Sequence, residues 1–559
     1  MSTRQNMRDH GSTQHLTTIS YLQMLSGRGA AWMHRASHGF GLRSNKGLDI
    51  SGLGARLSFL NPGDPAAAQE MARGTFSFAG AAVTGKPLDV LDAVPPNAEW
   101  VAALHNLSWL RHFVASGQEL HRIVARTLVL KWGGQRRHFR TPAINFQALL
   151  ALSCAAHFLV GTPPSSFEKP FYALVEGLIR RALEAHVAAP DDLLLQALAL
   201  QYASLAFRGP ASLRDHANAR FCAAIDHLIL PDGGHVSRNP QKLLEILLVL
   251  IPLKNAMVAQ REAVPHPLSA AIERMFPMLR MLSHGDRGLG NFQGAGAAEM
   301  GSLKAALDQD ASAGKPLLKA PYSGYCRLSH RSGLLLMDTG VPRECNSPLA
   351  IEFSDGPHRI FSNCGMPHDA AAAWRKAAAD IAAHNTVEVV SFVGETQSRP
   401  DADVVNSPSG SLINATNSIS NGVNRTNHHR NVFLSQDGDD LRGEDLVIPS
   451  GPKTSSIGPY EFTIRFHLHP DVKATLTRKR AGIVIMLPNQ TAWQFISRGG
   501  FLTLEDSVFL GGNSGPRKTQ QIVIRGSTES AAPVNWALRR VEKPAQSGHE
   551  TGEMPRLPF

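Results

Sequence analysis

Three polar residues in one short segment have the chemistry that proton transfer beside a carboxylate requires. Residues 230–240 read LPDGGHVSRNP and contain His235, Arg238 and Asn239. A histidine of ordinary pKa, about 6.5, exchanges protons near neutral pH, and a guanidinium binds a carboxylate through two parallel hydrogen bonds. We interpret His235 as a candidate base, and Arg238 and Asn239 as candidate substrate-binding residues. The same pattern fits a helix start with Ser237 or Asn239 as the N-cap before a proline, and the two roles are compatible.

A second segment, residues 374–387, reads WRKAAADIAAHNTV. It predicts a helical run over residues 374–383, which ends at His384, where a strand pattern begins. A residue at the edge of a sheet can hold an imidazole in a fixed orientation. We predict that His384 lies on the rim of a β domain, faces the helical domain and approaches residues 232–239. The structural alternatives are a histidine that caps a strand and a local salt bridge for Arg375.

The second segment resembles the C-terminal domain of the heparinase II/III-like polysaccharide lyases. In that family a glycine and a short loop precede Trp-Arg, and an Ala/Ser-x-His-Asn-Thr sequence follows. Here Gly365, Trp374-Arg375 and His384-Asn385-Thr386 occur in that order, and segments 441–445, 465–470 and 505–507 also agree. The resemblance covers about residues 311–540 well and the helical half more loosely. It implies that His384 matches a catalytic histidine.

The helical half departs from the family pattern at one position. In family lyases an Asp-Gly segment precedes a tyrosine that acts as catalytic acid and base. Set against that pattern, the tyrosine position falls on Lys242 and the following histidine on Leu243. The family chemistry therefore lacks its usual proton carrier in this chain.

Two functions remain open on this resemblance. The first is a lyase that cleaves an acidic, uronate-containing polysaccharide, heparin- or heparan-like or alginate-like, by β-elimination. A base removes the proton α to the carboxylate, an acid protonates the leaving oxygen, and hydrogen-bond donors stabilise the enolate. The candidate catalytic residues are His384 and His235, and the candidate substrate-binding residues are Arg238, Asn239, Asn385 and Arg375. The alternative is a non-catalytic acidic-polysaccharide-binding or cell-envelope-associated protein that retains the fold without the tyrosine.

The hydrophobic pattern changes once along the chain. From about residue 65 to 290 apolar residues recur at spacings of three and four, which predicts helices. After Pro321 the period becomes two, as in residues 333–338, which predicts strands. This order indicates a helical, (α/α) toroid-like domain followed by an antiparallel β-sandwich. We place a polar lead with one helix at 1–60, the helical domain at 61–312, the β domain at 313–545 and a flexible tail at 546–559.

Composition restricts the partners. The net charge of +10 favours an anionic partner, and we expect an electropositive cleft to which Arg238 contributes. The basic residues form no long run and no known nucleic-acid module appears, so acidic polysaccharide is favoured over nucleic acid. His467 and His469 alternate on a strand and would suit zinc, but no third ligand is evident, so we expect histidines without metal and no cofactor.

Targeting features point to one compartment. Five cysteines without a CxxC pair favour a reducing environment. No apolar signal segment and no stretch of 18 apolar residues is evident, so the expected location is cytoplasmic. The family resemblance supplies the alternative, the periplasm or cell envelope. No feature of the sequence indicates an oligomeric state.

Overall fold

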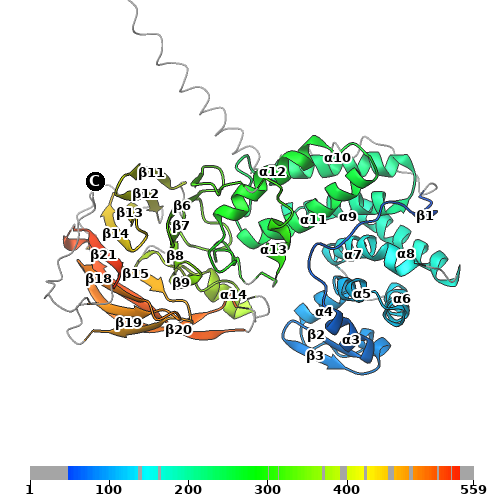
Figure 1. Cartoon of the computed structure of the whole chain (residues 1–559), viewed down its shortest axis with the longest axis horizontal. Coiled ribbons are helices and arrows are strands. Elements are labelled where there is room, and N and C mark those ends of the chain that lie inside the picture. Colours follow the sequence, from blue (N-terminus) through cyan, green and yellow to red (C-terminus); the bar gives the residue numbers. More distant parts are fainter. Residues whose placement is uncertain are drawn as a thin grey trace, which may run out of the picture.

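The computed structural model has a helical N-terminal half and a C-terminal half of antiparallel strands (Figure 1). It describes residues 48–135, 141–161, 165–296, 298–299, 301–312, 314–367, 372–390, 399–420, 425–450, 459–477, 482–512, 515–530 and 532–541. The change of period near Pro321 is therefore confirmed as the change of fold. The helix expected in the polar lead and the tail at 546–559 lie outside the described residues.

The helical half consists of helices of 6 to 20 residues. Their bounds are α3 Pro65–Arg73, α4 Ala98–His105, α5 Leu110–Ser116, α6 Glu119–Gly134, α7 Pro142–Val160, α8 Ser165–Glu184, α9 Pro190–Ala206, α10 Ala211–Leu228, α11 Pro240–Ala259, α12 His266–Met281 and α13 Ser302–Leu307. Proline stands in the first turn of α3, α7, α9, α11 and α12. There its missing N–H costs no helical hydrogen bond, so these prolines start helices.

Helix α7 is, among the described residues, the one long and apolar enough to cross a membrane by length and composition. It contacts α5, α8 and α9, and residues such as Leu149, Leu152 and Leu159 are fully buried against them. Its apolar character is thus accounted for by its place in the helical core.

The helical half also contains short strands that the sequence analysis missed. Strand β2 (Thr75–Phe78) pairs with β3 (Ala81–Thr84), and β1 (Gly52–Leu53) pairs with β4 (Phe207–Arg208). The β2–β3 turn has two residues with positive φ, 50° and 70°. Such two-residue turns match the twist of a hairpin. The prediction of an almost entirely helical region is corrected to this extent.

Strands of the C-terminal half form three antiparallel sheets. The five-stranded sheet has the order β5 Lys319–Ala320, β6 Tyr325–His330, β7 Gly333–Asp338, β8 Ile351–Asp355 and β9 His358–Phe361. The four-stranded sheet has the order β10 Val387–Val389, β15 Glu461–His467, β20 Arg517–Ser527 and β19 Phe501–Phe509. The eight-stranded sheet has the order β11 Asp401–Ser407, β12 Gly410–Ser420, β13 Arg425–Ser435, β14 Asp440–Pro449, β21 Val534–Arg540, β18 Ala492–Arg498, β17 Ile483–Met486 and β16 Lys473–Leu476.

The five-stranded sheet joins the two halves because both of its faces are buried. On β7, Leu334 and Leu336 pack into the core of the helical half, whereas Leu335 and Met337 pack into the core of the β domain. Alternate residues of a strand point to opposite faces, so a strand buried on both sides is a continuous apolar run. The sequence GLLLMD is such a run, and this sheet positions the loops at the junction.

Candidate functional site

The loop of residues 232–239, between α10 and α11, is fastened to the segment that leads into the β domain. The Asp232 carboxylate accepts hydrogen bonds from the backbone N–H groups of Tyr322 and Ser323, at 2.8 and 2.6 Å, and from the Ser323 hydroxyl at 2.6 Å. Gly233 has a φ of 87° and lies against the backbone of Arg274, where a Cβ would not fit. The loop therefore lies at the junction of the two domains.

Arg238 is buried in this junction, and protein groups bind its guanidinium. The guanidinium donates to the carbonyl oxygens of Ser323, Gly324 and Val341. It also forms an ion pair with Asp338 of β7 and stacks over the Tyr325 ring, 5.0 Å from its centroid. These contacts use four of the five N–H donors and bury the group, so the guanidinium is not presented to a substrate carboxylate. The prediction that Arg238 binds substrate in an electropositive cleft is corrected: its geometry makes it a link between domains.

Asn239 is the N-cap of α11. Its side-chain oxygen accepts hydrogen bonds from the backbone N–H groups of Gln241 and Lys242, at 2.8 and 3.2 Å. Two of the N–H groups that a helix start leaves free are thereby satisfied. The geometry thus matches the interpretation of this segment as a helix start, and the N-cap is Asn239 rather than Ser237.

His235 lies beneath this helix start and is 1% exposed. Its Nδ1 is 3.2 Å from the backbone N–H of Ser237 and 2.8 Å from the Ser237 hydroxyl. A backbone N–H only donates, so we assign Nδ1 as acceptor and the ring proton to Nε2. Burial lowers the pKa of His235 to about 4, against the opposing carboxylate of Asp191. The ring is neutral with its lone pair occupied, and the prediction of a base here is corrected.

Lys242, which the sequence comparison above set at the predicted tyrosine position, lies beside carboxylates. Its ammonium lies 3.3 Å from Glu245 and 3.8 Å from Asp191. Partial burial opposes ionisation, but the carboxylates of Glu245, Asp191 and Glu344 raise the pKa of Lys242 above its ordinary value. Lys242 is thus a fixed positive charge that neither accepts nor releases a proton near neutrality.

His384 ends the short helix η2 (Ile381–Ala383), which follows α14 (Ala372–Ala379), and is 2% exposed. Neither ring nitrogen has a hydrogen-bond partner of normal geometry among the described residues. Burial lowers the pKa of His384 to about 4, although the nearby backbone of Ala378 acts in the opposite direction and raises the pKa. The predicted place on the rim is corrected to one inside the β domain. No hydrogen bond or ion pair joins His384 to residues 232–239 within the described part of the chain.

Asn385 connects strands instead of facing a cleft. Its side-chain amide donates to the Ile351 carbonyl at 2.8 Å, and its side-chain oxygen accepts from the His467 backbone N–H at 2.5 Å. Its own backbone N–H donates to the Asn363 side chain at 2.8 Å. Each polar group of the Asn385 side chain is satisfied inside the protein, so the prediction that it binds substrate is corrected.

The two histidines considered for zinc have separate partners. His467 donates from Nε2 to the Ala382 carbonyl at 2.9 Å and accepts at Nδ1 from the Ser507 hydroxyl at 2.8 Å. Burial, and then the neighbouring His384, lower the pKa of His467 to about 3. His469 lies instead beside Asp471, 3.5 Å away. In the described ranges no group of three His, Cys, Asp or Glu residues is arranged to hold a metal ion.

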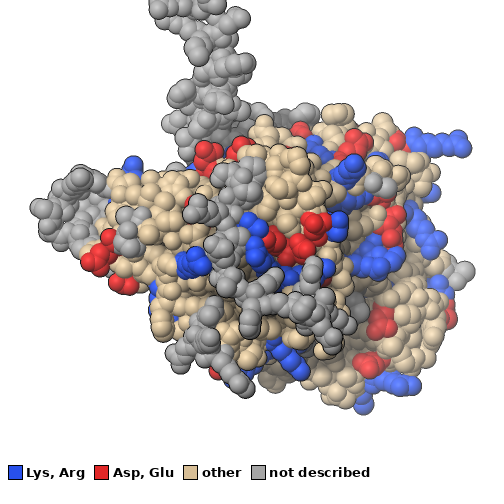
Figure 2. Space-filling model, turned by 60° about the vertical axis from the view of Figure 1, so that its left-hand side comes forward, with Lys and Arg blue, Asp and Glu red and all other residues tan. Residues whose placement is uncertain are grey.

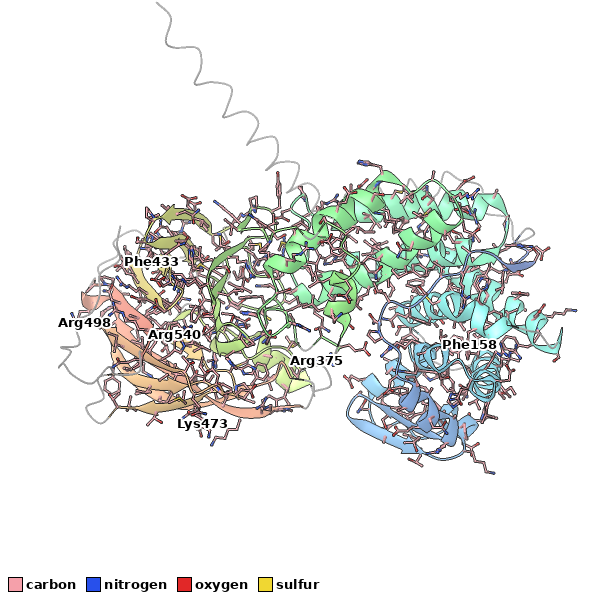
Figure 3. The ribbon with its side chains drawn as sticks, viewed as in Figure 1. Phe158, Arg375, Phe433, Lys473, Arg498 and Arg540 are labelled. Atoms are coloured by element: carbon pink, nitrogen blue, oxygen red, sulfur yellow. The ribbon has the colours of Figure 1, made fainter. Side chains whose placement is uncertain are left out.

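Arg375 extends from α14 toward the helical half (Figure 3). Its guanidinium lies 2.9 Å from the Glu99 carboxylate of α4, and the two side chains are 45% and 38% exposed. This pair joins the β domain to the first helices across the surface. The salt-bridge alternative for Arg375 matches this contact, although the partner is distant in sequence.

The predicted residues therefore form two separate groups. His235 and Asn239 lie with Lys242 at the junction, whereas His384 and Asn385 lie with His467 inside the β domain. The face in Figure 2 shows acidic and basic side chains interspersed, without an unbroken basic area. A depression of about 440 Å³ lies elsewhere on the β domain. It is lined by Leu468, Pro470, Val472, Lys473, Ala474, Asp506, Lys518, Thr519 and Gln520.

Three carboxylates of the junction were missed from the sequence. Asp191 follows Pro190 in the first turn of α9, where acidic residues favour the helix dipole. Glu245 lies three positions after Lys242 on α11, a spacing that places the two side chains together. Those two patterns were available, but nothing in the sequence around Glu344 indicates that it approaches Lys242.

Comparison with known proteins gives a family match for the C-terminal domain and a fold match for the whole chain. Residues 312–537 match the model of the heparinase II/III-like C-terminal domain. Over the whole chain the fold matches heparinase III with a TM-score of 0.67 at 12% identity, covering 91% of this chain and 89% of that one. The heparan sulfate lyase HepC from Pedobacter heparinus gives a TM-score of 0.59 at 12% identity, covering 92% and 88%. Residues 312–537 thus match the C-terminal domain of the heparinase II/III-like family, and the whole chain has the fold of heparinase III, a helical toroid followed by an antiparallel β domain.

A curated relative is more similar in sequence. FtsZ-localized protein C of Caulobacter vibrioides (strain NA1000 / CB15N) is 27% identical over 538 residues, which cover 88% of this chain and 91% of that protein. The similarity thus extends through the helical half, beyond the matched C-terminal domain.

Proposed function

We propose that the chain is a non-catalytic member of its family, which binds a polysaccharide at the domain junction without cleaving it by β-elimination. One observation carries this proposal: Lys242, which the family resemblance sets at the position of the proton-carrying tyrosine, is held in its charged form by Glu245 and Asp191. A protonated ammonium has no lone pair with which to remove a proton α to a carboxylate.

The surrounding residues support this proposal. The lone pair of the neutral His235 ring accepts from Ser237, and the guanidinium of Arg238 is bound to Asp338. Neutralisation of a uronate and removal of its proton require both groups to be free. The fold supports a polysaccharide as ligand, because heparinase III and HepC share it.

One observation favours the lyase alternative, cleavage of an acidic uronate-containing polymer. Neither ring nitrogen of His384 has a hydrogen-bond partner of normal geometry among the described residues, so exposure of this ring would give a histidine with a free nitrogen. The test is an absorbance assay for unsaturated uronate products over heparin, heparan sulfate and alginate, together with calorimetric binding to the same polymers. Binding without product supports the proposal, and product formation supports the lyase alternative. If no polysaccharide is either bound or cleaved, both the proposal and the lyase alternative are wrong.

We also propose a place of action at the cell-division site, by likeness to the relative named for its localisation with FtsZ. All five cysteines are unpaired, which fits a reducing compartment and supports the cytoplasm over the periplasm or envelope. A fluorescent fusion imaged together with FtsZ tests this. Overlap of the two signals at midcell is expected, and a uniform signal would contradict the proposal.

A further inference from the structure

Two carboxylates lie within 4 Å of Lys242, and a third, Glu344, is near enough to raise its pKa. Asp191 lies at the start of α9, Glu245 lies on α11, and Glu344 lies on the segment between β7 and β8. Gly294 has a φ of 80° and no side chain, so Glu344 and Asn239 both approach it closely: a Cβ there would lie 3.2 and 3.4 Å from them. Long-range folding thus assembles this acidic group at the junction.

The group is open to solvent and carries an excess of negative charge. The side chains of Asp191, Glu245 and Lys242 are 45%, 48% and 37% exposed, and Glu344 is exposed. One ammonium faces three carboxylates, because the His235 ring is neutral. Arg343, the next cation on the same segment, makes no ion pair with them among the described residues. The local charge is therefore opposite in sign to the net charge of the chain.

A second, independent feature indicates that this group receives a ligand. The Nε2–H of His235 is buried and has no hydrogen-bond acceptor of normal geometry in the part of the chain that the structure describes. It points toward Asp191, whose carboxylate oxygen is 3.5 Å away. A buried donor without an acceptor costs about 1–3 kcal/mol, whereas an oxygen of a bound ligand, or the Asp191 carboxylate drawn inward by one, would satisfy it. The site thus offers a donor beside the carboxylates.

We propose that this junction site binds a glycan that carries free amino groups. The inference rests on the proposed polysaccharide-binding function and names its ligand class. A protonated amino group forms charge-assisted hydrogen bonds with Asp191 and Glu344, and the hydroxyl oxygens of the same sugar match the donor of His235. A polyanion is disfavoured, because near Lys242 it would face the three carboxylates. A metal ion is disfavoured because no three ligands converge closely in the described ranges.

The test compares three probes on the full-length chain by calorimetry near pH 6. The probes are fully deacetylated glucosamine oligosaccharides, N-acetylglucosamine oligosaccharides of the same length, and heparin. We expect the deacetylated oligosaccharide to bind about tenfold or more tightly than the acetylated one, and its binding to weaken as salt rises. Equal affinity for the two oligosaccharides, or tightest binding to heparin, would overturn the inference and leave polysaccharide binding intact. No binding to any polysaccharide would overturn both.

Variants distinguish this site from general attraction of a polycation. The double variant Asp191→Asn/Glu344→Gln should lose about tenfold in affinity for the deacetylated probe. Glu245→Gln alone should lose about two- to fivefold, as expected for a partly exposed charge. Glu529→Gln removes an exposed carboxylate from the β domain and is the matched control, with no change expected. If the control and the double variant lose affinity equally, or if neither does, the site is wrong. Thermal melts of each variant verify that it is folded.

Discussion

Arg238 and Asp338 form an ion pair inside the junction of the two domains, where their side chains are 5% and 0% exposed. Removal of one member of such a pair leaves the other charge buried and uncompensated. We expect Arg238→Ala to lower the free energy of unfolding by about 3–5 kcal/mol, measured by urea denaturation. The exposed pair of Arg331 and Asp437 is the control, and Arg331→Ala should cost about 1 kcal/mol or less. Similar losses in the two variants would contradict the role of Arg238 as a link between domains.

The N-cap of α11 can be separated from any role of Asn239 in binding. Asn239→Ala removes the acceptor for the backbone N–H groups of Gln241 and Lys242. We expect a loss of about 1 kcal/mol in the free energy of unfolding. Asn239→Asp keeps an acceptor and should retain most of the stability. If Asn239→Ala weakened glycan binding while Asn239→Asp did not, and stability stayed unchanged in both, the side chain would act on ligand and not as a cap.

Local sequence patterns were sufficient for the fold. The run at residues 333–338 forms β7 with the same bounds. A strand that is buried on both faces has an unbroken run of apolar residues, so it can be recognised from the sequence. Proline positions likewise predict helix starts, as at Pro240. The β2–β3 hairpin was missed because its turn, Ala79-Gly80, is not one of the common turn pairs, and the flanking helical pattern outweighed it.

The candidate site was less predictable, because burial and pairing depend on contacts between distant segments. Arg238 has the residue type of a carboxylate clamp, but Asp338, which occupies it, lies 100 positions away. His384 is enclosed because η2 packs beside His467, whose ring donates to the Ala382 carbonyl. A motif indicates which residues a family uses for catalysis or binding. It does not indicate which of those side chains are paired with, or buried by, other residues of the same chain.

Buried neutral histidines should make the stability of the chain depend on pH. The pKa of His384 in the folded chain is about 4, below the ordinary value of about 6.5 in the unfolded chain. Between these values the unfolded chain binds the additional proton, so stability is complete above about pH 6.5 and falls as the pH decreases toward 4. His384 alone should account for a loss on the order of 3 kcal/mol. His384→Leu should therefore flatten the pH dependence of urea unfolding, and an unchanged slope would contradict burial of this ring.

The surface pair of Arg375 and Glu99 should contribute little to stability. Both side chains are more than one third exposed, so solvent and salt screen their attraction. A double-mutant cycle with Arg375→Ala and Glu99→Ala should give a coupling energy of about 0.2–1 kcal/mol, which decreases as salt is added. A coupling well above that range, unaffected by salt, would instead indicate a contact that holds the two domains together.

The final prediction concerns the position of the missing tyrosine. Lys242→Tyr supplies the residue type that the family resemblance predicts as proton carrier at this position, so it would be expected to give elimination if that side chain were the sole deficiency. We expect no unsaturated uronate product from heparin, heparan sulfate or alginate in the absorbance assay. The carboxylates of Asp191, Glu245 and Glu344 surround this position, and neighbouring negative charge raises the pKa of a tyrosine hydroxyl above about 10. Such a hydroxyl cannot act as base at neutral pH.

The residues near position 242 also limit what Lys242→Tyr can do. A uronate at the junction would need its charge neutralised, but the Arg238 guanidinium is bound to Asp338 and to backbone carbonyls, and the His235 ring accepts from Ser237. The triple variant Lys242→Tyr/Asp191→Asn/Glu344→Gln tests this step, because it removes two of the three carboxylates. It too should yield no product, since Arg238 stays occupied. Lys242→Gln is the control for loss of the ammonium alone. Product formation by Lys242→Tyr would show that one substitution separates this chain from a lyase, and that the junction has the remaining catalytic groups in place.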